Sequence, residues 1–286
     1  MVRLTFDPAV NVKQSCVRRR YRYASCRACA DACPAQAFSF SGQIAVDPQR
    51  CIECGNCLFA CPIEAIEGIA PVKRYRRGDT LVGPFSTLAP GTEELLLWHR
   101  QFGVRFVAMD PQQSATWMIA IVRLNLRLRQ YGEPEWAFVP PLQTGINASR
   151  RTLFHAPRED ATACRVTPGK RRLREAFPLM SDVELTLDDS RCEMCGACWR
   201  ACPEQAIRFQ GSDMVIETAR CTGCGICTAV CGHQALRLEE CIAPARVEKF
   251  GAHARTCTDC QRSFWSLDPH KERCGLCQKH QFGMRL

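Results

Sequence analysis

Short apolar segments separated by turns recur near both ends of the chain. Ala37–Phe40 and Ile44–Val46 flank one turn that contains glycine, and Ile207–Phe209 and Met214–Ile216 flank another. Apolar segments on either side of such a turn are typical of β-hairpins. The pattern therefore predicts two hairpins, one in each half of the chain.

The middle of the chain alternates between helical and extended patterns. Leu95–Trp98 follows two glutamates, which favour the first turn of a helix. A second helix is predicted after Ser114, because apolar residues recur at helical spacing at Trp117, Ile121, Leu124 and Leu128. Val104–Met109 and Glu135–Val139 are predicted strands. No Gly-rich phosphate loop follows a strand, so we expect residues 71–141 to form a small α/β spacer or docking domain. Residues 142–182 are polar and Arg-rich and predict a basic linker.

Cysteine is the most unusual component, with 22 residues in a chain of 286. No secretory signal and no apolar run long enough for a membrane span is visible, so we expect a cytoplasmic protein. In that compartment cysteines bind metals more often than they form disulfides. Three complete C-x2-C-x2-C-x3-C runs are present, at Cys51–Cys61, Cys192–Cys202 and Cys221–Cys231. A zinc site uses isolated cysteine pairs rather than interleaved groups of four, so these runs favour iron–sulfur clusters.

The runs resemble those of the bacterial ferredoxins that carry two [4Fe-4S] clusters. The resemblance covers residues 16–70 and 183–240. It implies one-electron transfer and an α+β chain with two ferredoxin-like two-cluster modules, at residues 1–70 and 183–240. It also implies that the fourth cysteine of each run binds the other cluster of its module. On that rule, three complete ligand sets are Cys33, Cys51, Cys54 and Cys57; Cys192, Cys195, Cys198 and Cys231; and Cys202, Cys221, Cys224 and Cys227. Short helices are expected to begin near the fourth cysteines, Cys33, Cys61, Cys202 and Cys231, since proline follows three of them.

One run departs from the ferredoxin pattern. Cys26, Cys29 and Cys33 align with the last three cysteines of a run, but Tyr23 stands where the first should be. Cys16 is the nearest upstream cysteine, and a cubane requires four thiolates. We therefore expect the fourth ligand set to be Cys16, Cys26, Cys29 and Cys61. The alternatives are a three-iron cluster and an unrelated free thiol at Cys16.

The tail, residues 241–286, contains two further cysteine pairs. Cys257 and Cys260 are followed after thirteen residues by Cys274 and Cys277. Paired C-x2-C knuckles predict a zinc ribbon with a closed structural site. Iron, as a cluster or as a single rubredoxin-like ion, is the alternative metal.

Charge is unevenly distributed around the formal net value of +9. Residues 181–240 contain five basic and ten acidic side chains, whereas residues 241–286 contain eight and four. No basic stripe carries interleaved aromatic residues, so nucleic acid is not the expected partner. We expect redox proteins as partners.

Two functions fit these features. The first is an electron-transfer polyferredoxin with four [4Fe-4S] clusters, acting as a subunit or partner of a larger oxidoreductase and without a catalytic site of its own. The alternative is a redox-sensing regulatory or assembly protein whose zinc ribbon binds a client or nucleic acid. A third possibility is an enzyme whose middle domain binds a flavin or a nicotinamide.

Overall fold

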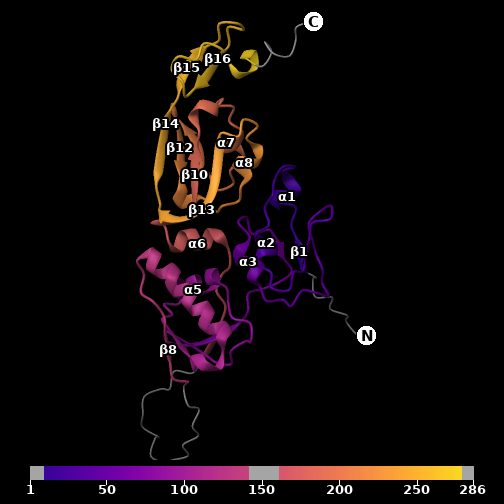
Figure 1. Ribbon diagram of the computed structural model, residues 1–286, viewed down its shortest axis with the longest axis vertical. Helices are drawn as coiled ribbons and strands as arrows, with labels where there is room; N and C mark the ends of the chain where they lie inside the picture. The colour runs from indigo at the N-terminus through magenta and orange to yellow at the C-terminus, as the bar shows by residue number, and fades with distance from the viewer. Residues whose placement is uncertain (1–9, 142–160, 279–286) are drawn as a thin grey trace, which may run out of the picture. The chain divides into compact units, whose positions relative to one another are not determined.

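The computed structural model describes residues 10–141 and 161–278, which fold as two compact units (Figure 1). The first unit comprises Met1–Lys13 and Arg27–Ala176, and the second comprises Gln14–Cys26 and Phe177–Leu286. The second unit therefore includes a short N-terminal segment with the helix α1 (Val17–Arg20). In the part of the chain that the structure describes, no helix has both the length and the apolar character of a membrane span.

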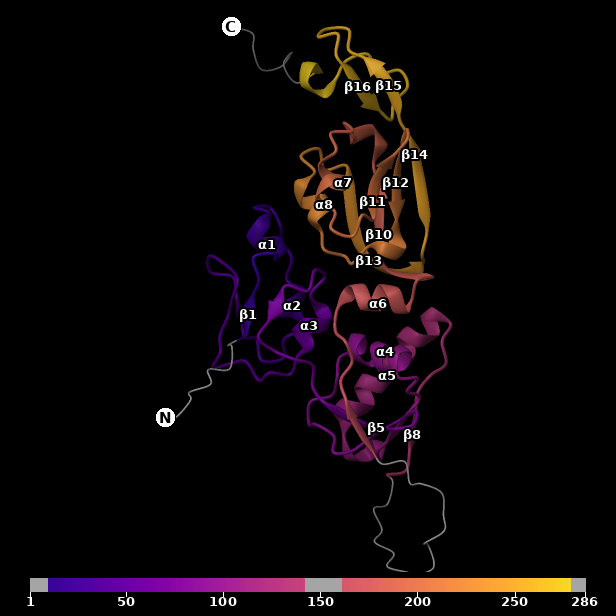
Figure 2. The same cartoon turned by 180° about the vertical axis from the view of Figure 1, so that it is seen from behind.

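The cysteine-rich module of the second unit is built on two antiparallel sheets. β10 (Met180–Leu187) pairs with β13 (Leu236–Pro244), and the second sheet has the order β11 (Ile207–Gln210), β12 (Asp213–Glu217) and β14 (Val247–Gly251). β11 and β12 form the predicted hairpin, with Gln210 opposite Asp213. The helices α7 (Ala197–Ala201) and α8 (Ile226–Val230) pack together beside these strands (Figure 2). The short 3-10 turns η2 (Asp189–Arg191) and η3 (Thr218–Arg220) precede the two cysteine loops.

The module extends further toward the C-terminus than expected. We had placed its end at residue 240, but β13 continues to Pro244 and β14 pairs with β12 along its whole length. The reason lies in β12, whose central residues Met214, Val215 and Ile216 are all buried. A buried central strand needs a hydrogen-bonding partner on each edge, and β14 supplies the second one. The hairpin β15 (His253–Thr256) and β16 (Ser263–Ser266) then follows directly (Figure 1).

The prediction that short helices begin at the fourth cysteines is wrong. α3 (Asn56–Ala60), α7 and α8 end immediately before Cys61, Cys202 and Cys231, and α2 (Ala28–Asp31) ends two residues before Cys33. Cys61 and Cys202 have extended backbones with ψ values of 116° and 111°. Each of these two cysteines precedes a proline, and the proline ring disfavours helical geometry in the residue before it. Proline therefore favours the ends of α3 and α7 rather than new helix starts, and α8 ends in the same way before Gly232.

The cysteine-rich part of the first unit contains only short paired strands. β1 (Asn11–Val12) pairs with β4 (Ile66–Glu67), and β2 (Phe38–Ser39) pairs with β3 (Ala45–Val46). The second pair is the hairpin predicted from the apolar pattern. α2 and α3 pack against each other between the two cysteine loops, as α7 and α8 do in the second unit.

The middle of the chain forms a five-stranded sheet with the order β8-β7-β6-β5-β9. Its elements are β5 (Arg74–Arg77), β6 (Thr80–Val82), α4 (Thr92–Gln101), β7 (Phe106–Ala108), the 3-10 turn η1 (Pro111–Gln113), α5 (Ala115–Tyr131), β8 (Ala137–Val139), β9 (Thr162–Cys164) and α6 (Lys170–Ala176). β6, β7 and β8 are parallel and are connected by α4 and α5, so this part has the predicted α/β character.

The segment expected to be a linker is partly structured. Residues 142–160 lie outside the described part of the chain, but Thr162–Cys164 forms the edge strand β9, paired with β5. α6 packs against α4, and its Leu173 is buried. Of the basic residues of α6, Lys170 pairs with Glu93 and Arg171 with Glu64, whereas Arg174 is buried.

A buried ion pair connects the sheet of this domain to α4. Arg74 on β5 bonds to Glu94 on α4 through Nε at 2.6 Å and Nη2 at 3.2 Å. The side chains are only 8% and 1% exposed. Trp98 also donates its indole N–H to Glu94, at 3.3 Å. The carboxylate therefore organises the packing of the helix on the sheet.

Replacing Glu94 with Gln should destabilise the first unit by about 3–5 kcal/mol, because Arg74 would remain buried without a counter-charge. The midpoint of urea unfolding, followed anaerobically by circular dichroism, measures this. Glu135→Gln is the matched control, since its Arg129 partner is exposed and the pair should contribute little. Equal midpoints for the two variants would contradict the role assigned to Glu94.

Candidate metal centres

The structure brings together three of the four predicted cluster ligand sets. Each of these sets lines a small cavity of its own, and none of these three cavities contains cysteines from two sets. The sets are Cys33, Cys51, Cys54 and Cys57; Cys192, Cys195, Cys198 and Cys231; and Cys202, Cys221, Cys224 and Cys227. In each set, three cysteines come from one loop and the fourth from the other half of the module, as the ferredoxin pattern implies.

Burial and mutual proximity shift the acidity of these thiols. Burial, together with the neighbouring cysteines of the same set, raises the pKa of Cys57, Cys198 and Cys224 to about 12. The pKa of Cys227 is raised well above its ordinary value for the same reasons. Without metal, these groups are therefore neutral thiols at physiological pH. Binding of a cluster must release protons, because only thiolates are metal ligands.

Glycine residues shape the three complete cysteine loops. Gly55, Gly196 and Gly225 are the N-caps of α3, α7 and α8, and their φ values are 77°, 84° and 70°. This left-handed conformation is readily available only to glycine. At Gly196 a Cβ atom would also lie 2.9 Å from the indole of Trp199. The loop can therefore wrap around a cavity only with glycine at this position.

The fourth cysteine of every run is followed by the same turn. The backbone N–H four residues later donates to the cysteine sulfur: Ala37 to Cys33 at 3.4 Å, Ala65 to Cys61 at 3.2 Å, Ala206 to Cys202 at 3.3 Å, and Ala235 to Cys231 at 3.3 Å. The residue before each alanine has a positive φ of 49° to 55°. Our sequence analysis missed these donors. The signal was the shared C-x3-A spacing, which continues each run. Hydrogen bonds to ligand sulfurs are among the features that set cluster potentials.

The incomplete run has a different loop. Arg27 occupies the position of Gly196, but its φ is −127°, so the left-handed loop geometry is not formed there. Cys16 is the N-cap of α1, and Tyr23, at the position of the missing ligand, is 77% exposed. Cys16 and Cys26 belong to the second compact unit, whereas Cys29 and Cys61 belong to the first. The assignment of these four cysteines to one cluster remains a prediction.

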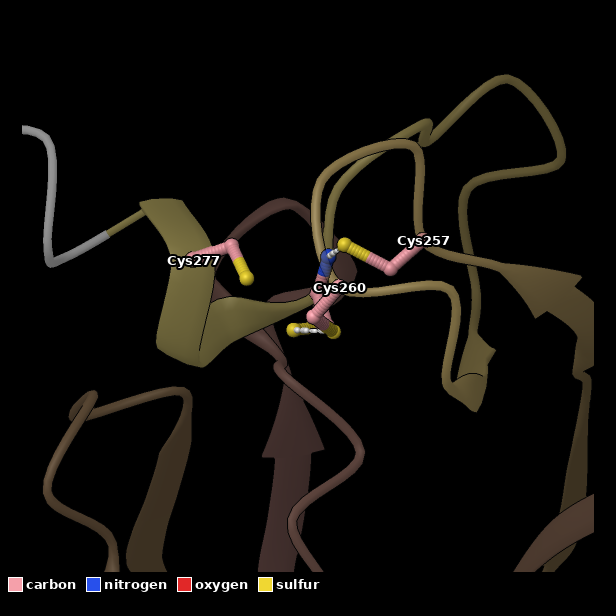
Figure 3. Close-up of side chains that lie close together, drawn as sticks. Cys257, Cys260 and Cys277 are labelled. Atoms are coloured by element: carbon pink, nitrogen blue, oxygen red, sulfur yellow. Dashed lines mark hydrogen bonds between the residues drawn. The ribbon is translucent and has the colours of Figure 1, made fainter.

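The four tail cysteines also come together. The sulfur atoms of Cys257, Cys260, Cys274 and Cys277 all lie within 4.8 Å of one another (Figure 3). Sulfur ligands on a tetrahedral metal at about 2.3 Å would be separated by slightly less than 4 Å, and Cys260 and Cys274 are 3.9 Å apart. This group could therefore hold one metal ion with few adjustments.

Hydrogen bonds within the tail group prepare one sulfur to bind a cation. The backbone N–H groups of Cys260 and Cys274 lower the pKa of Cys257 to about 6. A hydrogen bond with the Cys274 thiol raises the pKa of Cys277 to about 12. Without metal, Cys257 is therefore largely a thiolate near pH 7 and Cys277 is a neutral thiol, whose proton metal binding would displace.

Two cysteines lie apart from these sets. Cys164 is in β9 and Cys241 is in β13, and neither lines one of the three cluster cavities. They are the two cysteines that the ligand assignment leaves over.

A larger cavity, of about 570 Å³, lies in the middle domain. It is lined by Arg77, Val82, Ala108, Met109 and Trp117, among others, and no cysteine or carboxylate occurs among its described lining residues. The Nε atom of Arg77 is buried and has no hydrogen-bond partner among the described residues. This cavity is chemically distinct from the cysteine sites.

Comparison with known proteins agrees with the cysteine geometry. Two regions match models of the 4Fe-4S dicluster domain, at residues 24–65 and 184–232. The first match begins after Cys16, so it leaves out the predicted displaced ligand.

Two curated proteins are similar to parts of the chain. A putative electron transport protein, YsaA, from Escherichia coli (strain K12) is 32% identical over 103 residues, which cover 36% of this chain and 57% of that protein. A ferredoxin from Rickettsia felis (strain ATCC VR-1525 / URRWXCal2) is 36% identical over 62 residues, which cover 21% of this chain and 51% of that protein. The chain thus spans about half the length of these relatives. Taken with the cysteine sets, these matches support a ferredoxin-type iron–sulfur protein with two 4Fe-4S dicluster domains.

Proposed function

We propose that this chain is a polyferredoxin that carries four [4Fe-4S] clusters and passes single electrons within a larger oxidoreductase system, as a subunit or as a redox partner. The observation that carries the proposal is the presence of three separate cavities, each lined by four cysteines with the predicted division between loop and fourth ligand. The fourth site retains the Cys61 turn with its N–H···S hydrogen bond. A turn of this kind accompanies every fourth cysteine.

The residues of the second module support electron exchange between its two sites. Cys198 of one set lies close enough to Cys227 of the other to raise the pKa of that thiol. Clusters bound at these sites would supply the one-electron chemistry, and the chain would hold them side by side in a shared apolar core. This core includes Leu185, Ile207, Met214, Ile216 and Leu236. Such surroundings limit the access of water, which is one determinant of cluster potential.

We propose that the tail binds one zinc ion in a structural role. Four cysteines fill all four positions of a tetrahedral site, so no position remains for water or substrate. Iron remains the alternative metal, because the same sulfur geometry suits both ions.

The first prediction concerns cluster content. Anaerobically purified protein should contain about sixteen iron atoms per chain and an equal amount of acid-labile sulfide, since each cubane contains four of each. A value near twelve would mean that the site with the incomplete run is empty. A value near eight would leave one whole module without clusters and would contradict the proposal.

The same preparation identifies any co-purifying redox protein, which should reoxidise the reduced chain reversibly. Tight, strongly salt-dependent binding of nucleic acid would instead favour the regulatory function.

The second prediction concerns Cys16. Cys16→Ala should remove or convert one cluster of the first module and leave the second module intact, because a cubane with three protein ligands readily loses an iron. Electron paramagnetic resonance of the reduced variant, together with its iron content, measures the change. Cys164→Ala is the matched control and should leave both unchanged. If Cys16→Ala also leaves both unchanged, Cys16 is not a ligand.

The third prediction concerns the tail metal. Elemental analysis of the full chain should find about one zinc per chain, and Cys277→Ser should lose it while retaining the iron of the clusters. Iron in place of zinc, with the visible absorbance of an iron–thiolate centre, would show that the tail binds iron. Absence of any metal beyond the cluster iron would refute the assignment of the tail as a metal site.

A further inference from the structure

The tail is attached to the cysteine loop of the neighbouring cluster site by a short ion pair. Lys271 Nζ lies 2.6 Å from Oε2 of Glu193, and Glu193 stands between the ligand Cys192 and Met194. The two side chains are only 14% and 19% exposed. A pair this sheltered is screened by salt much less than a surface pair. Lys271 itself lies three residues before Cys274, in the segment that carries the second cysteine knuckle of the tail.

The backbone of that knuckle contacts the same glutamate. A Cβ atom at Gly275 would lie 2.6 Å from Oε2 of Glu193 and 3.2 Å from its carboxyl carbon. Only a glycine lets the knuckle approach this closely, since real Cβ atoms essentially never show such distances. The carboxylate of Glu193 is therefore held between Lys271 and the peptide that connects the tail ligands Cys274 and Cys277.

An aromatic series forms a second connection. Trp265 on β16 meets the ring of Phe209 edge-on, at a centroid distance of 5.2 Å. Phe209 in turn stacks on Trp199 at 5.5 Å. Trp199 directly follows the ligand Cys198 in α7. The first connection thus ends in the Cys192–Cys195 loop and the second at Cys198, so both reach ligands of one cluster set.

The contacts of Glu193 with Lys271 and Gly275 depend on the tail metal site, because that site would order the segment that contains both residues. The hairpin β15–β16 holds Cys257 by strand pairing, but the segment 268–278 contains no strand and only one helical turn. Few hydrogen bonds hold this segment to the hairpin, among them Thr258 N–H to the Glu272 carbonyl and Cys274 N–H to the Cys257 sulfur. A metal bound by all four cysteines would fix the segment, because small metal sites contribute folding free energy directly.

We propose that the tail metal centre positions the ligand loop of the cluster site formed by Cys192, Cys195, Cys198 and Cys231, with Glu193 and Lys271 as the positioning residues. Of the three cluster sites whose cysteines the structure gathers, this one alone would then respond to the state of the tail. The proposal rests on the proposed function, in that it requires a cluster at this site.

The sign of the effect follows from charge. Reduction adds one negative charge to the cluster, and the Lys271 ammonium beside the loop favours that state. Removal of Lys271 leaves the Glu193 carboxylate uncompensated next to the cluster, which disfavours reduction further. The reduction potential of this cluster should therefore fall in Lys271→Ala and stay close to the original value in Lys271→Arg, which keeps the charge.

The experiment uses the full chain, purified anaerobically, as Lys271→Ala, Lys271→Arg and Cys277→Ser. Arg273→Ala is the matched control, since Arg273 pairs with Asp259 inside the tail and not with the module. The readouts are iron and zinc content, the electron paramagnetic resonance spectrum of the reduced protein, and a potentiometric titration followed by that spectrum. The signal of the cluster in question is the one that Cys192→Ser removes.

Lys271→Ala should retain all metals and lower the potential of this one signal, and Arg273→Ala should leave every signal unchanged. Cys277→Ser should lose the tail metal, alter the same signal and lose that cluster several-fold faster in air. If Cys277→Ser does not fold, the test rests on the reduction potential of this signal in Lys271→Ala and on its recovery in Lys271→Arg. Unchanged potential and spectrum in Lys271→Ala, with all clusters present, would overturn the inference. Absence of the cluster from the unmodified chain would instead overturn the proposed function.

Discussion

Both cysteine-rich modules depend on one constraint: four sulfur atoms from distant parts of the chain must meet in one small cavity. Burial makes this costly, since it holds the thiols of Cys57, Cys198 and Cys224 in their neutral form. Thiolates at these positions become stable only when a cation shares the cavity. Metal binding and the loss of these protons are therefore linked, so a bound metal contributes to the free energy of folding of these modules.

The sequence predicted the grouping of the cysteines better than the ends of the helices and domains. The resemblance to two-cluster ferredoxins grouped the cysteines of three sets, because three ligands lie in one tight loop and the fourth comes from the other run of the module. The hairpins and the parallel strands of the middle domain also followed from the periodicity of apolar residues. Helix starts were misplaced because proline after Cys61 and Cys202 was taken as a first-turn residue. In the structure it acts on the residue before it and ends the preceding helix.

Other features depend on contacts that local patterns do not contain. Residues 162–176 contain many arginines and suggested a linker, but Thr162–Cys164 completes a sheet begun ninety residues earlier. The pairing of β14 with β12 likewise joins residues on either side of the expected module boundary. The contact of Glu193 with Lys271 spans 78 residues of sequence. The periodicity of a single sequence does not predict such long-range pairings, because each partner on its own resembles an ordinary surface segment or charge.

The turn after each fourth cysteine has a consequence for how these sites can change over time. Its donor is a peptide N–H, which every residue except proline provides. Nearly any substitution at Ala37, Ala65, Ala206 or Ala235 would therefore keep the hydrogen bond to sulfur, provided that the new side chain fits. The side chains at these positions can therefore change during evolution while the hydrogen bond to the sulfur is kept. The incomplete run illustrates the point: Tyr23 and Arg27 stand where the other runs have a cysteine and a glycine, while the amide of Ala37 still donates to Cys33 at 3.4 Å.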